Sequence, residues 1–411
     1  MRTLRTELRW ALAALVVLAS LTPAERLRAE ERDSSVRAKA MKLNDVTGMD
    51  PLRGEVLALL DDKPATRKLV AEAARMAKDK SQPFTYNATL ILATAANQVK
   101  DYQAAETFYR LHRDQAKQLG SAKGVITAYS GLISALFEAK KYAEAEKICK
   151  EAIDHDLIRG TLERLGRETD RDSEAERKPV ERFRTLVIEE MILSIAQQGD
   201  DDRANDTIDR IFKDQPNNWL SLDLKARVYR IVGKNKEAVK TYEDELDRIK
   251  NDKDLKDEAK ESLLDDIRYS LSGVYVETNQ IDKAAEQLKA LLKKEPDNPT
   301  YNNDLGYIWA DHDMNLAESE KLIRKALEED RKQRRKTNPK DDKENGAYLD
   351  SLGWVLFKQK KYEEAKKYLQ KAVELEEGKH IEIYDHLGDV LMAMDRKAEA
   401  VAAWKKGVES A

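Results

Sequence analysis

Apolar residues recur at helical spacing along most of the chain, and the pattern is clearest between residues 350 and 377. In the stretch DSLGWVLFKQKKYEEAKKYLQKAVELEE, Leu352, Leu356 and Leu369 fall on one side of two short helices that are separated by the polar residues Lys360 and Lys361. Spacing of three or four residues is typical of an amphipathic helix. The stripe is too large for one helix pair to cover, so we expect neighbouring pairs to bury it by stacking.

The same pattern repeats along the chain. Gly353 and Ala365 recur 35 residues later as Gly388 and Ala400. Stepping backwards, Leu305 and Gly306 match residues 34 positions earlier. The small residues that mark the repeat, one set in the first helix of each unit and one opening the second helix, are Ala105, Ala145, Ala204, Ala226, Ala238, Ala284, Gly306, Ser319, Gly353, Ala365, Gly388 and Ala400.

Small residues at these positions have a physical cause. Two antiparallel helices in a short hairpin approach closely where they cross, and only Gly, Ala or Ser lets the backbones come within about 8 Å. Large apolar residues fill the layers on either side. The composition agrees, since 36% of residues are charged and there are only 16 Gly and 9 Pro, which favours ion-rich helices. The sequence therefore predicts an all-α fold of antiparallel helix hairpins.

These residues resemble the tetratricopeptide repeat family, whose 34-residue pattern is matched most fully from residue 299 to 411. The resemblance covers about residues 85–411. It implies a right-handed superhelical solenoid in which the first helix of each hairpin lines a concave groove. Residues 30–84 are expected to form a helical N-terminal segment with one degenerate unit near residues 51–83.

A second period of 81 residues separates Ala238 from Ser319 and Ser319 from Ala400, which suggests that a block of two units was duplicated. The extra residues are highly charged and fall near 247–258 and 328–346. Shared between two helices, about six residues each would lengthen both by roughly 9 Å into water. A longer polar segment, 159–183, has no apolar period, so we expect a loop that divides the repeats of 85–158 from those of 184–411.

The first 29 residues differ from the rest. Arg2, Arg5 and Arg9 precede an apolar run at residues 10–21, which is followed by small residues suited to signal peptidase. We expect a secretory signal and an exported, periplasmic or secreted protein. The alternatives left open are an uncleaved membrane anchor formed by residues 10–21 and a buried first helix. No cysteine follows the run, so a lipoprotein anchor is not expected, and the single Cys149 falls on an apolar stripe where a buried thiol is expected.

The charge balance changes the partners that we expect. The chain has 73 basic and 77 acidic residues and a formal net charge of −4, so no overall basic field attracts nucleic acid or an anionic membrane. The basic run RKQRRK at 331–336 follows three acidic residues and contains no aromatic residue for base stacking. A solvated helix with internal ion pairs explains it better than phosphate contact. We therefore expect no nucleic acid, and a membrane only through an uncleaved N-terminus.

No catalytic motif is present. The chain contains no phosphate-binding glycine loop, no H-E-x-x-H helix and no C-x-x-C pair, and one cysteine cannot build a thiolate zinc site. His386 follows Asp385, but adjacent helix residues point about 100° apart, so we expect a surface histidine rather than an acid–base pair. We predict no catalytic residue, no metal, no cofactor and no enzymatic activity.

The best functional candidate is the groove that the resemblance implies. Its inward positions are expected to be acidic and aromatic, and family members that clamp a C-terminal carboxylate use Lys and Asn there instead. A peptide with basic and apolar side chains fits better, because carboxylates and aromatic rings attract cations. The alternative left open is that Tyr307 and Trp354 merely pack between units. The candidate groove residues are Asn303, Tyr307, Asp350, Trp354, Phe357, Glu382, Asp385, Asp389 and Met392.

Taken together, the sequence predicts a non-catalytic protein–protein interaction scaffold of the cell envelope that holds polypeptide partners in a helical groove. The alternative is a membrane-anchored accessory or regulatory module that recruits an enzyme or an assembly complex. The state of the N-terminus separates these two hypotheses, because a cleaved chain is released and an intact one is anchored.

Overall fold

The computed structural model describes residues 35–79, 83–165, 171–214, 219–337, 344–375 and 380–410. All regular secondary structure within these ranges is helical, as expected for the all-α class. The predicted signal segment at residues 1–29 lies outside the described residues. The chain divides into two compact units between Ile208 and Asp209.

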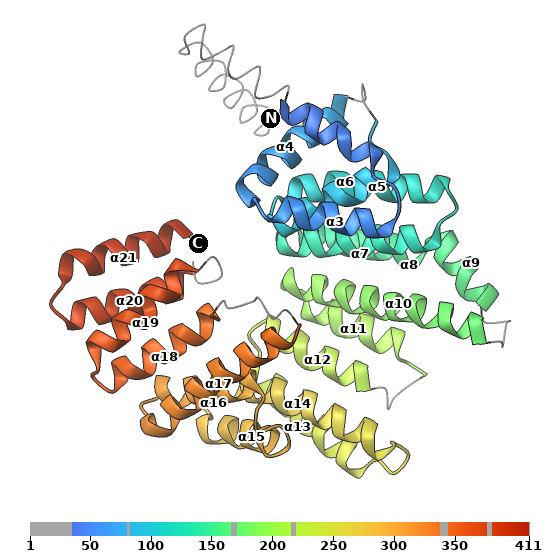
Figure 1. Cartoon of the computed structure of the whole chain (residues 1–411). Helices are drawn as coiled ribbons and strands as arrows, with labels where there is room; N and C mark the ends of the chain where they lie inside the picture. The colour runs from blue at the N-terminus through green and yellow to red at the C-terminus, as the bar shows by residue number, and fades with distance from the viewer. Residues whose placement is uncertain are drawn as a thin grey trace, which may run out of the picture. The chain divides into compact units, whose positions relative to one another are not determined.

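The first unit is an array of helices in chain order (Figure 1). A helical segment at residues 35–42 precedes it. Its elements are η1 (Leu43–Asp45), α3 (Met49–Leu60), α4 (Lys63–Asp79), α5 (Tyr86–Gln98), α6 (Tyr102–Gln118), α7 (Ala122–Glu138), α8 (Tyr142–Ile153), α9 (Asp156–Leu165), α10 (Arg171–Gln197) and α11 (Asp201–Ile211), within which the division falls.

The second unit consists of five helix hairpins, each packed against the next along the chain (Figure 1). They are α12 (Trp219–Ile231) with α13 (Asn235–Asn251), α14 (Asp257–Glu277) with α15 (Ile281–Lys294), α16 (Pro299–Asp311) with α17 (Leu316–Thr337), α18 (Gly346–Lys358) with α19 (Tyr362–Glu374), and α20 (Ile381–Ala393) with α21 (Lys397–Ser410).

The close approach of paired helices depends on the small residues. Those predicted to open the second helices all lie in second helices and are fully buried. A Cβ added at Gly353 would lie 2.5 Å from Cγ of Leu369 on α19, and one at Gly306 would lie 2.6 Å from Cγ1 of Ile323 on α17. Either distance is far inside van der Waals contact. These two glycines therefore let the first and second helices of a hairpin touch.

The turns inside the hairpins share one conformation. Lys360, between α18 and α19, has φ of +63°, in the left-handed region. The N–H of Lys361 then donates to the carbonyl oxygen of Leu356 at 2.9 Å, which satisfies one of the free carbonyls at the end of α18. The same pattern recurs at Lys100, Lys140, Asn279, Asp313 and Asp395. The turn reverses the chain in few residues, so the second helix packs directly against the first.

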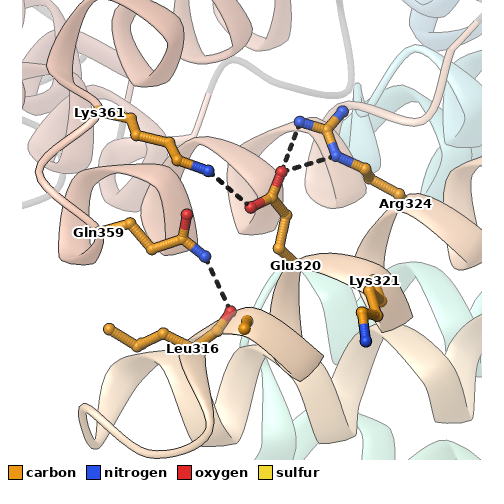
Figure 2. A pocket seen from close by; sticks show the side chains of 7 residues that line it. Leu316, Glu320, Lys321, Arg324, Gln359 and Lys361 are labelled. Atoms are coloured by element: carbon orange, nitrogen blue, oxygen red, sulfur yellow. Dashed lines mark hydrogen bonds and ion pairs between the residues drawn. The ribbon is translucent and has the colours of Figure 1, made fainter.

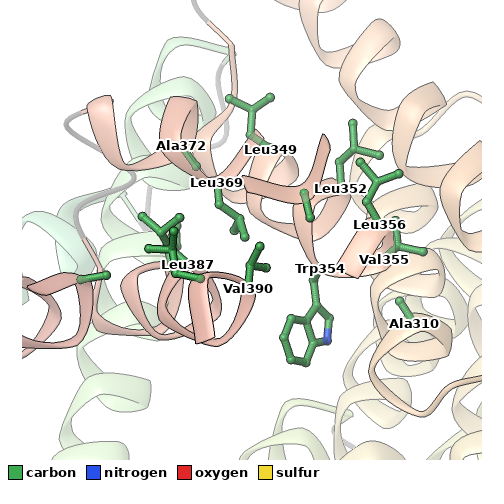
Figure 3. Close-up of a cluster of buried hydrophobic side chains, with 14 of the residues drawn as sticks. Ala310, Leu349, Leu352, Trp354, Val355, Leu356, Leu369, Ala372, Leu387 and Val390 are labelled. Carbon is green, nitrogen blue, oxygen red and sulfur yellow. The ribbon is translucent and has the colours of Figure 1, made fainter. Parts of the chain in front are cut away.

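Stacking of hairpins buries apolar side chains of the second unit in clusters that neighbouring hairpins share. Figure 3 shows apolar side chains of α18, α19 and α20 gathered in one cluster, with Ala310 of α16 at its edge. Leu352, Leu356 and Leu369, the stripe expected from the sequence, are all buried within it. Each hairpin therefore covers the apolar side of its neighbour.

Two sequence expectations need correction. The polar segment 159–183 is not a loop in its described parts, because α9 and the start of α10 occupy them, and α10 is anchored by the buried Val180 and Phe183. The expectation failed because these two residues are isolated among charged ones and give no clear period. The extra residues near 328–346 are also not shared between two helices, since α17 has 22 residues and α18 only 13.

The other charged extension follows the expectation more closely. Near 247–258 both α13, with 17 residues, and α14, with 21, are long. Within α17 the run at 331–336 is helical as expected, and its cations pair along the helix: Lys332 contacts Glu328 and Glu329 at 2.7 and 2.9 Å, and Arg334 contacts Asp330 at 2.7 Å. These pairs neutralise much of the run locally.

The N-terminal units hold two further expected features. A helix pair, α3 and α4, occupies residues 49–79, where a degenerate unit is expected. Cys149 on α8 is fully buried, and burial raises the pKa of its thiol to about 12, so it stays protonated. None of the described helices combines the length and the low polarity required to cross a bilayer.

Candidate functional site

Residues around the glycines of α16, α18 and α20 form a stripe along the first helices of the second unit. The positions three before and one after each glycine are four residues apart and therefore lie on the same side of the helix. They are Asn303 and Tyr307 on α16, Asp350 and Trp354 on α18, and Asp385 and Asp389 on α20. We call the surface formed by these residues, together with Tyr269 on α14, Asp304 on α16 and Glu382 on α20, the first-helix face.

The structure places the predicted groove residues at different depths. Asn303, Asp350 and Trp354 are each only 8% exposed. Tyr307, Phe357 and Asp389 are half-buried, whereas Glu382, Asp385 and Met392 are exposed. Glu382 and Asp385 line an open depression of about 370 Å³ with Ile381, Trp404 and Val408. The stripe thus runs from a closed centre on α18 to an open end on α20.

Trp354 packs between hairpins, which is the alternative that the sequence left open. Its indole Nε1–H donates to Oδ1 of Asp311 on α16 at 3.1 Å. Its ring stacks on His386 of α20, with centroids 4.1 Å apart, and on Phe357, 5.1 Å away. Lys358 Nζ lies 5.1 Å from the centre of the indole. Figure 3 shows the ring at the edge of the apolar cluster. Trp354 therefore joins three consecutive hairpins.

His386 is not the surface residue expected from the sequence. Its Nδ1 lies 2.8 Å from Oδ1 of Asp350, and the side chain is only 12% exposed. The expectation considered the neighbouring Asp385 on the same helix, but the partner is a carboxylate on the next hairpin. Equivalent positions in other units hold Asp304 and Ser351, so the repeat alone does not predict a histidine there.

The charge around His386 favours its protonated form. Burial by itself lowers the pKa of the imidazole, but the hydrogen bond to Asp350 and the nearby charges of Asp350, Asp385 and Asp389 outweigh burial and raise the pKa above 6.5. In the same surroundings, burial and Asp385 raise the pKa of Asp389. A protonated His386 therefore supplies the cation that Asp350 would otherwise take from a ligand.

Four other carboxylates of the first-helix face lack a lysine or arginine partner within the described ranges. Among the described residues, no lysine or arginine forms an ion pair with Asp304, Glu382, Asp385 or Asp389, although the chain contains 73 basic residues. Burial also raises the pKa of Asp304. A row of acidic side chains without basic partners leaves this face negatively charged.

Acidic residues on the second helices are arranged differently. Figure 2 shows Glu320 of α17 between Arg324 on its own helix and Lys361 of the next hairpin, at 2.8 and 3.0 Å. Gln359 Nε2 donates to the carbonyl oxygen of Leu316 beside them at 2.9 Å. These residues line an open depression of about 490 Å³. Their charges are already satisfied within the chain, so this depression offers little to a charged ligand.

The described residues contain no group of three or more His, Cys, Asp or Glu side chains that could hold a metal ion. The acidic residues of the first-helix face follow the helices rather than surround one point: Asp304 lies on α16, Asp350 on α18, and Glu382, Asp385 and Asp389 along α20. Their chemistry is that of an extended surface, suited to a partner that presents several cations along its length.

Comparison with known proteins finds tetratricopeptide repeats in part of the chain. Residues 346–379 and 271–334 match models of the tetratricopeptide repeat. A TPR repeat-containing protein of Pseudomonas aeruginosa is 33% identical over 121 residues, which make up 29% of this chain and only 18% of that protein. Two stretches of the chain, residues 271–334 and 346–379, are therefore similar to tetratricopeptide repeats, as the sequence pattern indicates.

The solved structures that match about half of this chain share little of its sequence. A tetratricopeptide repeat protein from Parabacteroides merdae is 17% identical, with 55% of this chain and 80% of that chain covered and a TM-score of 0.42. BtubC from P. vanneervenii is 18% identical, with 52% and 89% covered and a TM-score of 0.39. Tetratricopeptide repeats generally serve as interaction scaffolds, and no enzyme family is indicated for this chain.

Proposed function

We propose that this protein is a non-catalytic scaffold of the cell envelope that binds polypeptide segments on the first-helix face of its second unit. The observation that carries the proposal is the row of carboxylates at Asp304, Glu382, Asp385 and Asp389, which have no lysine or arginine partner in the part of the chain that the structure describes. Beside them stand half-buried or exposed aromatic rings such as Tyr269 and Tyr307. The partner is expected to carry lysine or arginine next to an apolar residue.

The charge of the first-helix face favours a basic polypeptide segment over an acidic ligand. Unpaired carboxylates attract cations and raise the rate of encounter with a basic segment, while they repel phosphate and a free C-terminal carboxylate. Aromatic rings add contact area and bind cations through their faces. A nucleic acid or an acidic peptide would be repelled by these carboxylates.

Binding of a labelled peptide tests the proposal. The probe is a fluorescein-labelled peptide of repeating Leu-Arg-Ser, and its counterpart is repeating Leu-Glu-Ser; fluorescence anisotropy gives both affinities. We expect the basic peptide to bind at least about tenfold more tightly and to weaken as salt rises from low to physiological concentration. Equal affinity for the two peptides would contradict the proposal.

The double variant Asp385→Asn with Asp389→Asn locates the interaction. It removes two carboxylates of the face and is expected to weaken the basic peptide severalfold. The matched control is Glu363→Gln with Glu364→Gln on α19, where both side chains are exposed on a second helix. If both double variants weaken binding equally, the peptide binds by net charge alone and the face is not the site.

The envelope location is supported by the three arginines and the apolar run at residues 10–21. The mass of the protein purified from its native cells tests it. A mature chain that lacks about the first 29 residues indicates export and release. An intact chain recovered with membranes would instead support the alternative, an anchored accessory module, and an intact chain in the cytosol would refute both.

A further inference from the structure

Consecutive first helices of the second unit contact each other through one recurring pair of positions. Each first helix carries one small repeat residue. The residue three positions before it on one helix contacts the residue two positions before the small residue of the next first helix. Tyr269 on α14 donates its hydroxyl to Oδ2 of Asp304 on α16 at 3.0 Å. Asp350 on α18 accepts from Nδ1 of His386 on α20 at 2.8 Å. Both pairs are hydrogen-bonded across the boundary between hairpins.

The pair between these two is incomplete. Asn303 on α16 and Ser351 on α18 hold the equivalent positions, but the hydroxyl of Ser351 donates to the carbonyl oxygen of Ala347 on its own helix at 3.1 Å. Asn303 is only 8% exposed, and its Oδ1 is buried without a hydrogen-bond partner. Buried polar atoms are normally bonded, so an unpaired acceptor marks a place where a donor is missing.

The residue with the unpaired acceptor, Asn303, lies next to the carboxylate of Asp304. Nδ2 of Asn303 donates to Oδ1 of Asp304 at 3.3 Å, which holds the amide and the carboxylate together. Among the described residues, no lysine or arginine pairs with Asp304. Burial raises the pKa of Asp304, although its bonds to Tyr269 and Asn303 act in the opposite direction. A cation placed here would stabilise the carboxylate and could satisfy Asn303.

Two aromatic rings form the outer part of this cluster. The ring of Tyr269 is 40% exposed and lies 5.5 Å from the ring of Tyr301, tilted by 48°. Exposed tyrosine faces attract cations, and a planar guanidinium stacks on them better than a spherical ammonium. Arginine also carries five N–H donors in a rigid fork, enough to reach a carboxylate and an amide oxygen together.

We propose that Tyr269, Tyr301, Asn303 and Asp304 form a site that binds an arginine side chain of the partner segment. This inference rests on the proposed function, since it names the anchor point of the same peptide. The guanidinium stacks on the exposed ring of Tyr269, donates to Asp304, and supplies the donor that Asn303 Oδ1 lacks. Lysine reaches the carboxylate but offers no planar fork, so the site distinguishes arginine from lysine.

Peptide binding by matched variants tests the site. The probes are labelled repeating Leu-Arg-Ser and Leu-Lys-Ser peptides, measured by anisotropy on the full chain. We expect the arginine peptide to bind at least about fivefold more tightly to the wild type. Asp304→Asn should lower the affinity for the arginine peptide about tenfold and abolish the preference for the arginine peptide over the lysine peptide. The control Asp282→Asn, an exposed carboxylate on the second helix α15, should change neither affinity by more than about twofold.

A second variant protects the test against a folding defect. Tyr301→Leu leaves the charge and the Asp304 carboxylate in place, and it should reduce the arginine preference while the circular dichroism spectrum stays unchanged. If the basic peptide binds the wild type but Asp304→Asn and Tyr301→Leu match the control, the site is refuted while the proposed function stands. If neither basic peptide binds the wild type, the proposed function itself fails.

Discussion

The imidazole of His386 on α20 bonds to the carboxylate of Asp350 on α18, with 2.8 Å between Nδ1 and Oδ1, and stacks on the indole of Trp354 one turn further along α18. The residues are 36 positions apart in the sequence, so the contact links consecutive hairpins. The sequence assigns Asp350 and Trp354 to a ligand-binding groove. In the structure a side chain of the protein itself, His386, contacts both of them instead.

The first prediction concerns pH and this pair. Asp350, Asp385 and Asp389 raise the pKa of His386 above 6.5 in the folded state. As pH rises, the unfolded state therefore loses the proton of His386 at a lower pH than the folded state does. The stabilisation is therefore complete below about pH 6.5 and is lost as pH rises through the folded pKa. Asp350→Asn should cost about 2 kcal/mol of unfolding free energy at pH 6 and less at pH 9.

Urea unfolding followed by circular dichroism at both pH values measures that difference. Glu409→Gln, an exposed carboxylate on α21 of the same hairpin, serves as the charge control and should leave the unfolding midpoint unchanged. NMR titration of the His386 imidazole gives its pKa directly. A value below 6.5 would contradict the ion pair.

The second prediction concerns Glu245 on α13, which is 2% exposed and has an unpaired Oε2. Burial, with the nearby charge of Asp223, raises its pKa to about 8. Its folded form therefore contributes stability below about pH 4.5 that is lost as pH rises through about 8. Glu245→Gln should raise the unfolding free energy at pH 8 by about 1 to 3 kcal/mol and change it little at pH 4.5.

Asp244→Asn, the exposed neighbour on the same helix, is the matched control for Glu245→Gln. Urea midpoints at pH 4.5 and 8 are compared for the three proteins. Equal pH dependence in wild type and Glu245→Gln would show that Glu245 ionises normally.

The third prediction tests the close approach of paired helices. Gly353→Ala places a Cβ 2.5 Å from Cγ of Leu369, so α18 and α19 must separate, and we expect a loss of about 1 to 3 kcal/mol. Gly54→Ala on α3 meets nothing within 4 Å and should be neutral or slightly stabilising, because alanine favours helices. Thermal melting of both variants decides; equal melting temperatures would mean that the crossing is not tight.

The fourth prediction separates packing from binding at Trp354. The ring is 8% exposed and contacts α16 and α20, so Trp354→Ala should destabilise the protein by about 3 to 5 kcal/mol. Trp354→Phe keeps the stack on His386 but loses the hydrogen bond to Asp311. We expect this variant to lose about 1 kcal/mol of unfolding free energy. Unchanged melting of Trp354→Ala together with lost peptide binding would instead show that Trp354 is a binding residue.

The repeat pattern predicts which residues of the candidate site lie on the first helices, but it does not predict which of them are covered by other side chains. Placing Asp350, Trp354 and Asp385 on the first helices needs only the register set by Gly353 and Gly388. Which of them stays open cannot be predicted in this way. His386 closes over Asp350, whereas the equivalent serine on α18 leaves Oδ1 of Asn303 without a hydrogen-bond partner.

The sequence by itself determined the helix hairpins, because helical period and small residues at a crossing are local properties that recur at fixed spacing. Gly353, Ala365, Gly388 and Ala400 are sufficient to predict that two backbones meet there. Only the tertiary structure decided which side chains pair between hairpins and how deeply each is buried. Those contacts depend on the rotation and crossing angle of neighbouring hairpins, and packing of the whole array sets both.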